Sequence, residues 1–204
     1  MSRRPLLVTD CDEVLLHMVS HFADWVADAH AMSFDLASPG FRNALRGPDG
    51  APVDEERIWP LLDEFFRGEM HRQNLVPGAG EALAEISRHA DIVILTNIGD
   101  EHEAGRVEQL SRFDITHRVL CNRGGKGRPV LELVQGMSPS ATVFVDDLAV
   151  HHESVAKHAP DVWRLHMIAE PRLAQRTPPA DHAHARIDAW DEALPWILDK
   201  LGAA

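Results

Sequence analysis

The hydrophobic positions of the chain form short uninterrupted runs in some regions and a helical rhythm in others. Short apolar runs, rich in β-branched residues, occur at Leu6–Val8, Asp91–Leu95 and Ala141–Val145. Such runs are typical of strands that are buried on both faces of a sheet. Arg118–Cys121 and Asp161–Met167 are further candidates for short strands.

Between these strands the apolar residues recur every three or four positions, which is the spacing of one buried helix face. The helices predicted in this way are Glu81–His89, Glu101–Arg112, Val130–Gln135, Ala149–His158 and Ala189–Leu201. Residues 1–14 and 77–204 therefore alternate strand and helix. This alternation is typical of an α/β fold, and we predict a Rossmann-like parallel sheet core with helices on both faces.

Residues 15–76, which we call the cap segment, interrupt this alternation. Helical spacing occupies Leu15–Met32 and Asp54–His71, with at most a short helix at Phe41–Leu45 between them. Turn-forming residues separate the three stretches. We predict a small helical cap that is inserted directly after the first strand of the α/β core.

The composition of the chain argues against some classes of binding partner. Its 204 residues are 45 % hydrophobic and carry a formal net charge of −12, so we expect neither nucleic acid nor an anionic membrane as a partner. Cys11 and Cys121 are too few for a disulfide framework, and we expect a reducing, cytoplasmic setting. The chain shows no signal-peptide pattern and no run of roughly 18–20 apolar residues that could span a membrane. A monomer and a homodimer both remain open.

Polar side chains stand at the ends of the three most apolar strands. They are Asp10 and Asp12, Thr96 and Asn97, and Asp146 and Asp147. Ligands of open parallel sheets bind at the carboxyl ends of the strands, so we expect these residues to meet at one edge, together with Lys126 from a glycine-rich loop. Asp10 and Asp12 should leave their strand on the same side, where a cation or a proton must offset their repulsion. A helix N-cap would explain one aspartate but not both.

These residue types suit phosphoryl transfer. Carboxylate oxygens are the ligands that Mg²⁺ prefers, and a carboxylate can attack phosphorus to form an aspartyl-phosphate. Hydroxyl, amide and ammonium groups can bind the remaining oxygens of the transferred group. We therefore predict a metal-assisted phosphoryl-transfer site at this edge.

The motifs that carry this chemistry are Asp10-x-Asp12, Thr96-Asn97, Lys126 and Asp146-Asp147. In this order they resemble the four motifs of the haloacid dehalogenase-like hydrolase superfamily. The resemblance covers essentially the whole chain, with the cap segment in the place of that family's helical cap. It implies a Mg²⁺-dependent phosphatase that hydrolyses a small phosphorylated metabolite through an aspartyl-phosphate intermediate.

The resemblance also implies roles for single residues. Asp10 would be the nucleophile and Asp12 the general acid/base, while Thr96, Asn97 and Lys126 would bind the phosphoryl group. Lys126 would also steady the charge of Asp10.

For the metal, the resemblance implies that Asp10 and Asp147 bind Mg²⁺, with Asp146 as a neighbouring or alternate ligand. The backbone carbonyl of Asp12 would complete the protein ligands. Family members that cleave carbon–halogen bonds lack the second aspartate, so Asp12 favours a phosphatase over a 2-haloacid dehalogenase.

The sequence departs from the family pattern at three positions. Glu13 stands where glycine is usual, His151 where aspartate or asparagine is common, and Asp146 replaces a frequent glycine. These departures keep open a non-catalytic, phosphate- or metal-binding member of the same fold.

Other candidate residues have simpler explanations. The pairs His151–His152 and His182/His184 lack a cysteine at zinc-ligand spacing, so we expect both on the solvated surface. Cys11 lies between two aspartates, which raise the pKa of a thiol, and we expect it to pack in the core.

Overall fold

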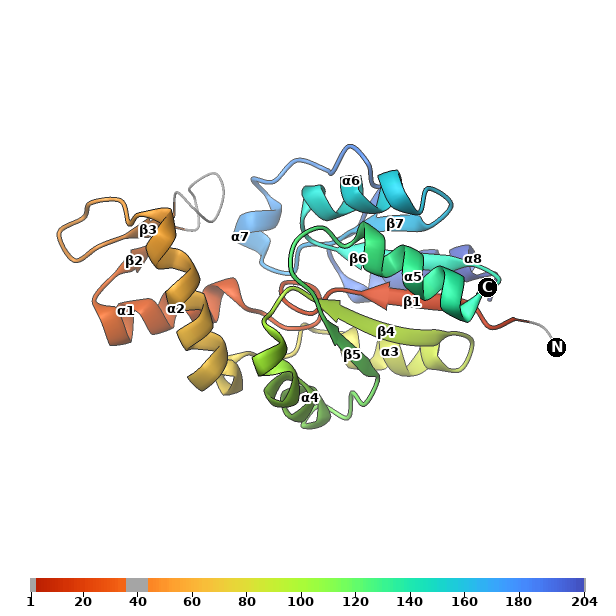
Figure 1. The fold of residues 1–204 in the computed structure, drawn as a ribbon, viewed down its shortest axis with the longest axis horizontal. Helices are drawn as coiled ribbons and strands as arrows, with labels where there is room; N and C mark the ends of the chain where they lie inside the picture. The colour runs from red at the N-terminus through yellow and green to blue at the C-terminus, as the bar shows by residue number, and fades with distance from the viewer. Residues whose placement is uncertain (1–2, 36–43, 204) are drawn as a thin grey trace.

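A sheet-based lobe and a smaller lobe formed by the cap segment make up the molecule (Figure 1). The structure is a computed structural model, and it describes residues 3–35 and 44–203.

Six parallel strands form the sheet, in the order β5-β4-β1-β6-β7-β8. They are β1 (Leu6–Thr9), β4 (Asp91–Thr96), β5 (Arg118–Cys121), β6 (Thr142–Asp146), β7 (Trp163–His166) and β8 (Ala185–Arg186). The central strand β1 pairs with β4 and β6, so Val8 lies between Val93 and Phe144. This topology confirms the predicted Rossmann-like α/β fold. The two-residue strand β8 is too short to leave a hydrophobic period in the sequence.

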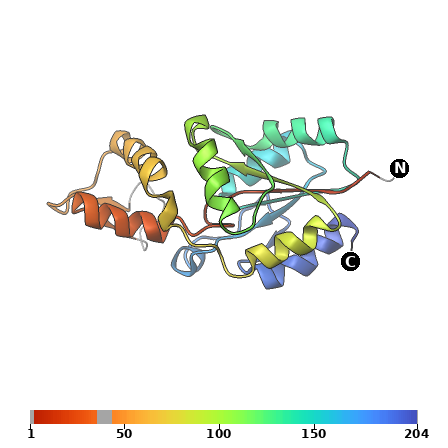
Figure 2. The same ribbon diagram turned by 90° about the horizontal axis from the view of Figure 1, so that it is seen from below.

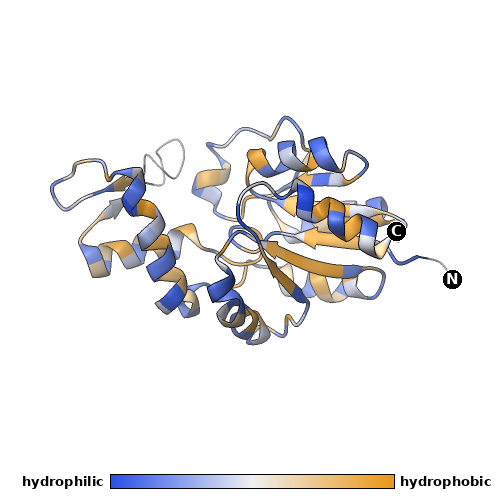
Figure 3. Ribbon diagram, viewed as in Figure 1, coloured by the Kyte–Doolittle hydropathy of each residue, from blue (hydrophilic) through white to orange (hydrophobic). Residues whose placement is uncertain are grey.

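Helices cover both faces of the sheet (Figure 2). The helical segments of this lobe are α3 (Ala79–Ser87), η3 (Asp100–His102), α4 (Glu103–Ser111), α5 (Gly127–Met137), α6 (Ala149–His158), α7 (Pro171–Ala174) and α8 (Trp190–Leu201). α3 and α8 pack on the face that presents Leu7, whereas α5 and α6 pack on the face that presents Leu6 and Val8. Because both faces are covered, the strands are the most continuously hydrophobic elements of the lobe (Figure 3).

The cap segment has a hydrophobic core of its own. Its elements are α1 (Val19–His30), β2 (Ser33–Phe34), β3 (Leu45–Arg46), α2 (Glu55–Gly68) and η2 (Met70–Arg72). Phe22 of α1 and Phe65 of α2 are both fully buried, and their ring centroids are 5.6 Å apart in an edge-to-face arrangement. The prediction of helices alone was wrong, because β2 and β3 form an antiparallel ribbon. Of the predicted short helix, residues 41–43 lie outside the described residues, and Leu45 belongs to β3.

The cap segment contacts the sheet lobe beside α4. Nε2 of His102 lies 2.7 Å from Oδ1 of Asp63 in α2, and Gln109 of α4 donates to the backbone carbonyl of Met70. Within the region that the structure describes, no helix is long and apolar enough to cross a bilayer.

Trp190 at the start of α8 offers a test of this packing. It is fully buried, and its Nε1 donates to the carbonyl of Val14 at 2.8 Å. We expect Trp190→Ala to lower the free energy of unfolding by about 3–5 kcal/mol, because it leaves a large cavity under the sheet. Trp59→Ala is the matched control: this side chain is 59 % exposed, and the expected change is within about 0.5 kcal/mol. If denaturant titrations showed that both variants lose the same free energy of unfolding, the result would contradict this packing.

Candidate functional site

Lys126 joins the carboxyl ends of two neighbouring strands. Its Nζ lies 2.7 Å from Oδ1 of Asp10, just beyond β1, and 2.7 Å from Oδ2 of Asp146, at the end of β6. All three side chains are buried. Lys126 immediately precedes α5, so the glycine-rich loop and the first turn of that helix carry it to the edge. Residues from three distant parts of the sequence therefore meet there, together with Asp147.

Three carboxylates form one compact acidic cluster at this edge. Asp10, Asp146 and Asp147 each offer an oxygen, and these oxygens all lie within 4.8 Å of one another. Lys126 supplies a single positive charge against three acidic groups. Such a donor set fits a hard divalent cation, which carries the charge that the lysine does not offset.

The pKa values of these groups reflect the crowding. Burial raises the pKa of Asp10 to about 7, with Lys126 acting to lower it and Asp146 to raise it further. Burial and then the charges of Asp146 and Asp10 raise the pKa of Asp147 well above its usual range. For Asp146 burial acts in the same direction, but Lys126 and His151 outweigh it and lower the pKa. Burial opposes the charged form of Lys126, yet the two adjacent carboxylates hold its pKa above the usual range.

Hydrogen bonds fix one oxygen of Asp10 and leave the other open. Oδ1 accepts from the backbone N–H of Cys11 at 2.7 Å and also contacts Lys126. In the part of the chain that the structure describes, Oδ2 accepts no hydrogen bond. Both oxygens of Asp146 are occupied, by Lys126 and by the N–H of Leu148. Among the described residues, Oδ2 of Asp10 is therefore open to a ligand.

The end of β4 brings Thr96 and Asn97 to the same side of the molecule, with different surroundings. Thr96 is fully buried, and its Oγ1 has no hydrogen-bond partner among the described residues. A buried hydroxyl without a partner is costly, and a ligand oxygen would satisfy it. Asn97 instead donates to the carbonyl of Gly124 at 2.9 Å and accepts from Asn122 at 2.8 Å. These bonds hold the loop that leads to Lys126.

Asp12 lies outside the acidic cluster. Nη2 of Arg106 is 2.9 Å from each of its carboxylate oxygens, and Nε2 of Gln73 donates to Oδ1 at 2.7 Å. Strand β1 ends at Thr9, so strand alternation does not fix the direction of Asp12. The positive charge that offsets Asp12 comes from α4, and sequence reasoning missed Arg106 because nothing in its helical pattern marks it.

Glu13, at the position where the family pattern has glycine, adopts a left-handed backbone conformation with φ of 60°. Its buried carboxylate accepts from the N–H groups of Met18 and Val19 at 2.8 and 2.7 Å, and from that of Glu170 at 3.0 Å. Burial raises the pKa of Glu13 to about 6, while these donors act to lower it. The side chain therefore caps the start of α1, which begins at Val19 and not at the predicted Leu15.

The prediction that His151 and His152 lie on the surface was wrong, since both are buried. Nε2 of His152 lies 3.0 Å from the carbonyl oxygen of Asp146, and Nε2 of His166 lies 2.8 Å from that of Asp147. Because Ala180 N–H donates to Nδ1 of His166, Nε2 carries the proton and donates to Asp147. His152 and His166 therefore hold the backbone of Asp146 and Asp147 in place, whereas Nε2 of His151 lies 3.2 Å from Nδ2 of Asn97.

His182 and His184 were predicted to lie on the surface, and Cys11 was predicted to pack in the core. Both His182 and His184 are exposed, and neither is in a group of potential metal ligands among the described residues. Cys11 is fully buried in the core, and burial raises the pKa of its thiol to about 12.

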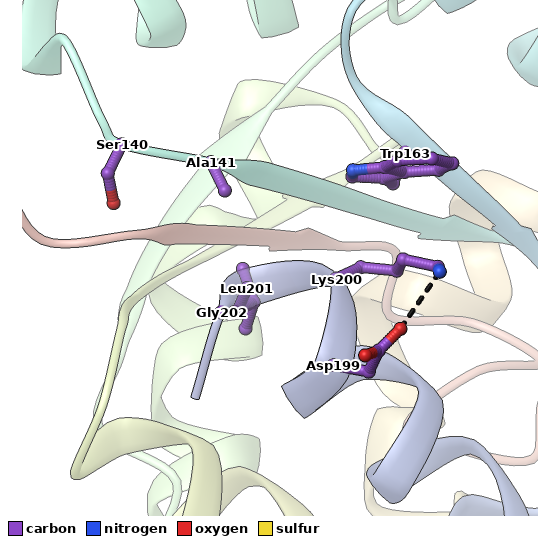
Figure 4. A pocket seen from close by; sticks show the side chains of 7 residues that line it. All are labelled: Ser140, Ala141, Trp163, Asp199, Lys200, Leu201 and Gly202. Atoms are coloured by element: carbon purple, nitrogen blue, oxygen red, sulfur yellow. Dashed lines mark hydrogen bonds and ion pairs between the residues drawn. The ribbon is translucent and has the colours of Figure 1, made fainter. Parts of the chain in front are cut away.

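A separate pocket of about 480 Å³ opens at the opposite edge of the sheet, near the amino ends of β6 and β7. Figure 4 shows Trp163 on one side of it, and Lys200 and Asp199 on the other. Nζ of Lys200 lies 4.8 Å from the indole ring centroid of Trp163 and 2.9 Å from Oδ2 of Asp199. None of the predicted site residues lines this pocket.

Solved structures match the chain over nearly its whole length, whereas no family model and no curated protein matches the sequence. A protein of Burkholderia xenovorans assigned as a haloacid dehalogenase-like hydrolase is 16 % identical with a TM-score of 0.63, covering 98 % of this chain and 99 % of that one. One from Lactobacillus plantarum assigned as a phosphoglycolate phosphatase is 15 % identical with a TM-score of 0.61, covering 96 % and 99 %. Magnesium-bound YfnB of Bacillus subtilis, assigned as a hydrolase of the same family, is 14 % identical with a TM-score of 0.63, covering 97 % and 100 %. The chain has the fold of the haloacid dehalogenase-like hydrolases, which confirms the predicted resemblance at the level of the fold.

Replacement of Glu13 tests its role at the start of α1. Glu13→Ala removes the acceptor of three backbone N–H groups, and we expect it to lower the free energy of unfolding by about 1–3 kcal/mol. Glu13→Gln keeps one oxygen acceptor and the same backbone requirement, so its loss should be smaller. Hydrogen exchange should show faster exchange of the Val19 amide in Glu13→Ala only. Equal stability of wild type and Glu13→Ala would refute this role.

Proposed function

We propose that the chain is a Mg²⁺-dependent phosphatase of the haloacid dehalogenase-like superfamily. Its substrate would be a small phosphorylated metabolite, hydrolysed through an aspartyl-phosphate on Asp10. The observation that carries this proposal is the cluster of the buried Asp10 and Asp146 with the half-buried Asp147 around Lys126, at the carboxyl edge of the sheet. The likeness of the fold to the solved hydrolases supports it.

Lys126 and Thr96 are the proposed phosphoryl-binding groups. An ammonium group has three donors, and contacts to Asp10 and Asp146 use two of them. The third is free for a phosphoryl oxygen. The unpartnered Oγ1 of Thr96 can donate to another, and satisfying this hydroxyl would favour binding.

Asp10 is the proposed nucleophile because its two oxygens differ. Oδ1 is held by Cys11 N–H and Lys126, which aims the open Oδ2. Attack of Oδ2 on phosphorus forms the aspartyl-phosphate as the bond to the leaving oxygen breaks. Water then attacks phosphorus and restores the carboxylate, with Asp12 as the nearby proton-exchanging group.

Asp10 and Asp147 would hold the Mg²⁺, with Asp146 and the backbone carbonyl of Asp12 beside them. When bound, the ion would offset the excess negative charge of the cluster and of the phosphoryl group. The magnesium-bound YfnB structure, with the same fold, supports this choice of ion.

Asp10→Asn tests the mechanism. We expect hydrolysis of 4-nitrophenyl phosphate with added Mg²⁺ to fall about 10³-fold or more, because an amide oxygen is a poor nucleophile. Asp91→Asn is the matched control, since Asp91 lies at the opposite end of the sheet and pairs with Arg4. Circular dichroism should show that both variants are folded.

Three results would decide against this proposal. Full activity of Asp10→Asn would rule out the aspartyl-phosphate. Halide release from small haloacids without metal would favour the dehalogenase. Binding of Mg²⁺ or phosphate without turnover of any substrate in a broad panel of phosphate esters would favour the non-catalytic member of the fold.

Metal binding should depend on pH. With the pKa of Asp10 raised to about 7, a proton occupies this carboxyl at lower pH and competes with the cation. The Mg²⁺ dissociation constant should therefore rise as pH falls from 8 to 6, by up to about tenfold per pH unit for each proton released. Isothermal titration calorimetry in buffers of different ionisation enthalpy measures both the Mg²⁺ dissociation constant and the number of protons released on binding. A dissociation constant that is independent of pH across this range would contradict the prediction.

A further inference from the structure

The two glycines that flank Lys126 have no room for a side chain. A Cβ atom at Gly125 would lie 2.6 Å from Oγ of Ser154, and one at Gly127 would lie 2.1 Å from the carbonyl oxygen of Ser154. Both distances are well below an ordinary van der Waals contact of roughly 3.5–4.0 Å. The loop therefore packs on both sides of Lys126 against a single residue, Ser154 of α6, and this close approach requires glycine.

Ser154 also accepts a hydrogen bond from this segment. Its Oγ accepts from the backbone N–H of Gly127 at 3.0 Å. Lys126 is the N-cap residue of α5, where a side-chain acceptor usually satisfies an N–H group of the first turn. The ammonium group of Lys126 cannot serve in this way, since it only donates. Ser154 therefore supplies an acceptor to the start of α5 from a different helix.

Helix α6 connects this loop to the acidic edge of the sheet. It begins at Ala149, shortly after Asp146 at the end of β6. Oδ2 of Asp146 lies 2.7 Å from Nζ of Lys126. The segment that carries Asp146 thus continues into the helix that holds the backbone on both sides of Lys126. Because a lysine side chain has a flexible four-carbon stem, a fixed backbone narrows where its buried ammonium group can lie.

We propose that Ser154 is a positioning residue for Lys126: it holds Gly125 and Gly127 against α6, so that the ammonium group lies between Asp10 and Asp146. Ser154 acts through the backbone of the loop and not through contact with a substrate. The expected effect on turnover rests on the proposed phosphatase function, whereas the expected effect on the position of Lys126 does not.

A double-mutant cycle of Gly125→Ala and Ser154→Gly tests this role, with kcat/KM for 4-nitrophenyl phosphate and added Mg²⁺ as the readout. The φ of Gly125 lies outside the left-handed region, so alanine can adopt its backbone conformation. In Gly125→Ala the added methyl group should push Oγ of Ser154 away from the Gly127 N–H. We expect kcat/KM to fall on the order of 10²-fold, because a small displacement of a catalytic group costs about that much.

The two substitutions should not act independently. Ser154→Gly removes the same acceptor and should cost a similar factor in kcat/KM. In the double variant the added methyl group has no side chain to displace, so the loss should equal that of Ser154→Gly alone and not the product of the two losses. If Ser154→Gly does not fold, Ser154→Ala, which removes only Oγ, takes its place in the cycle.

Gly136→Ala is the matched control. Gly136 lies near the end of α5, and a Cβ atom there would meet no atom within 4 Å. This variant should keep the wild-type kcat/KM. All rates are measured below the unfolding transition of each variant, as followed by circular dichroism, so that a loss of stability alone does not lower kcat/KM.

Crystal structures of wild type and Gly125→Ala provide a readout that needs no turnover. In wild type, Nζ of Lys126 should lie within hydrogen-bond distance of both Asp10 and Asp146. In Gly125→Ala, at least one of these contacts should be lost.

Two results would overturn the role of Ser154 with the phosphatase function intact. One is a wild-type kcat/KM in Ser154→Gly. The other is a loss from Gly125→Ala that is equally large in the Ser154→Gly background, which would show that Gly125 is needed for another reason, such as direct approach of the substrate.

Absence of hydrolysis of any phosphate ester by wild type would overturn the proposed function instead. The two crystal structures would still decide the role of Ser154, since unchanged contacts of Lys126 in Gly125→Ala would refute it.

Discussion

The contact of one buried ammonium with two carboxylates fixes the geometry of the candidate site. Lys126 lies 2.7 Å from Asp10 and 2.7 Å from Asp146, on strands that are neighbours in the sheet. Moving any of the three side chains would leave a buried charge without its partner, which costs several kcal/mol. The pairing leaves the Asp147 carboxylate and Oδ2 of Asp10 without a hydrogen-bond partner among the described residues. In the proposed function, these two groups would bind the cation and attack phosphorus.

The acidic residues that follow Asp10 are satisfied by donors from other elements. Asp12 receives side-chain donors from Arg106 and Gln73, and Glu13 receives backbone N–H groups at the start of α1 and before α7. These donors therefore offset both carboxylates, which lie outside the cluster of Asp10, Asp146 and Asp147. Glu13 at a glycine position is thus a structural cap and gives no reason to infer a disrupted site.

The fold and the cluster residues were largely predictable. Short uninterrupted apolar runs identify the strands, and Asp10, Thr96 and Asp146 mark their carboxyl ends, which a parallel sheet brings to one edge. The errors have local causes. His152 was predicted on the surface because a polar side chain in a helix gives no sign of a buried backbone carbonyl that it could contact. His151 was missed because nothing in the sequence shows that it meets the side chain of Asn97. The β2–β3 ribbon was missed because strands of two residues have no period.

The sequence by itself determined the layered α/β fold and the acidic edge of the sheet, because burial periodicity and strand direction are local properties. Only the tertiary structure decided how the charges at that edge are offset. The partners of Asp12 lie 61 and 94 residues further along the chain, and packing alone brings them together. Charge compensation depends on which donors meet a carboxylate in three dimensions, and no spacing in the sequence encodes that.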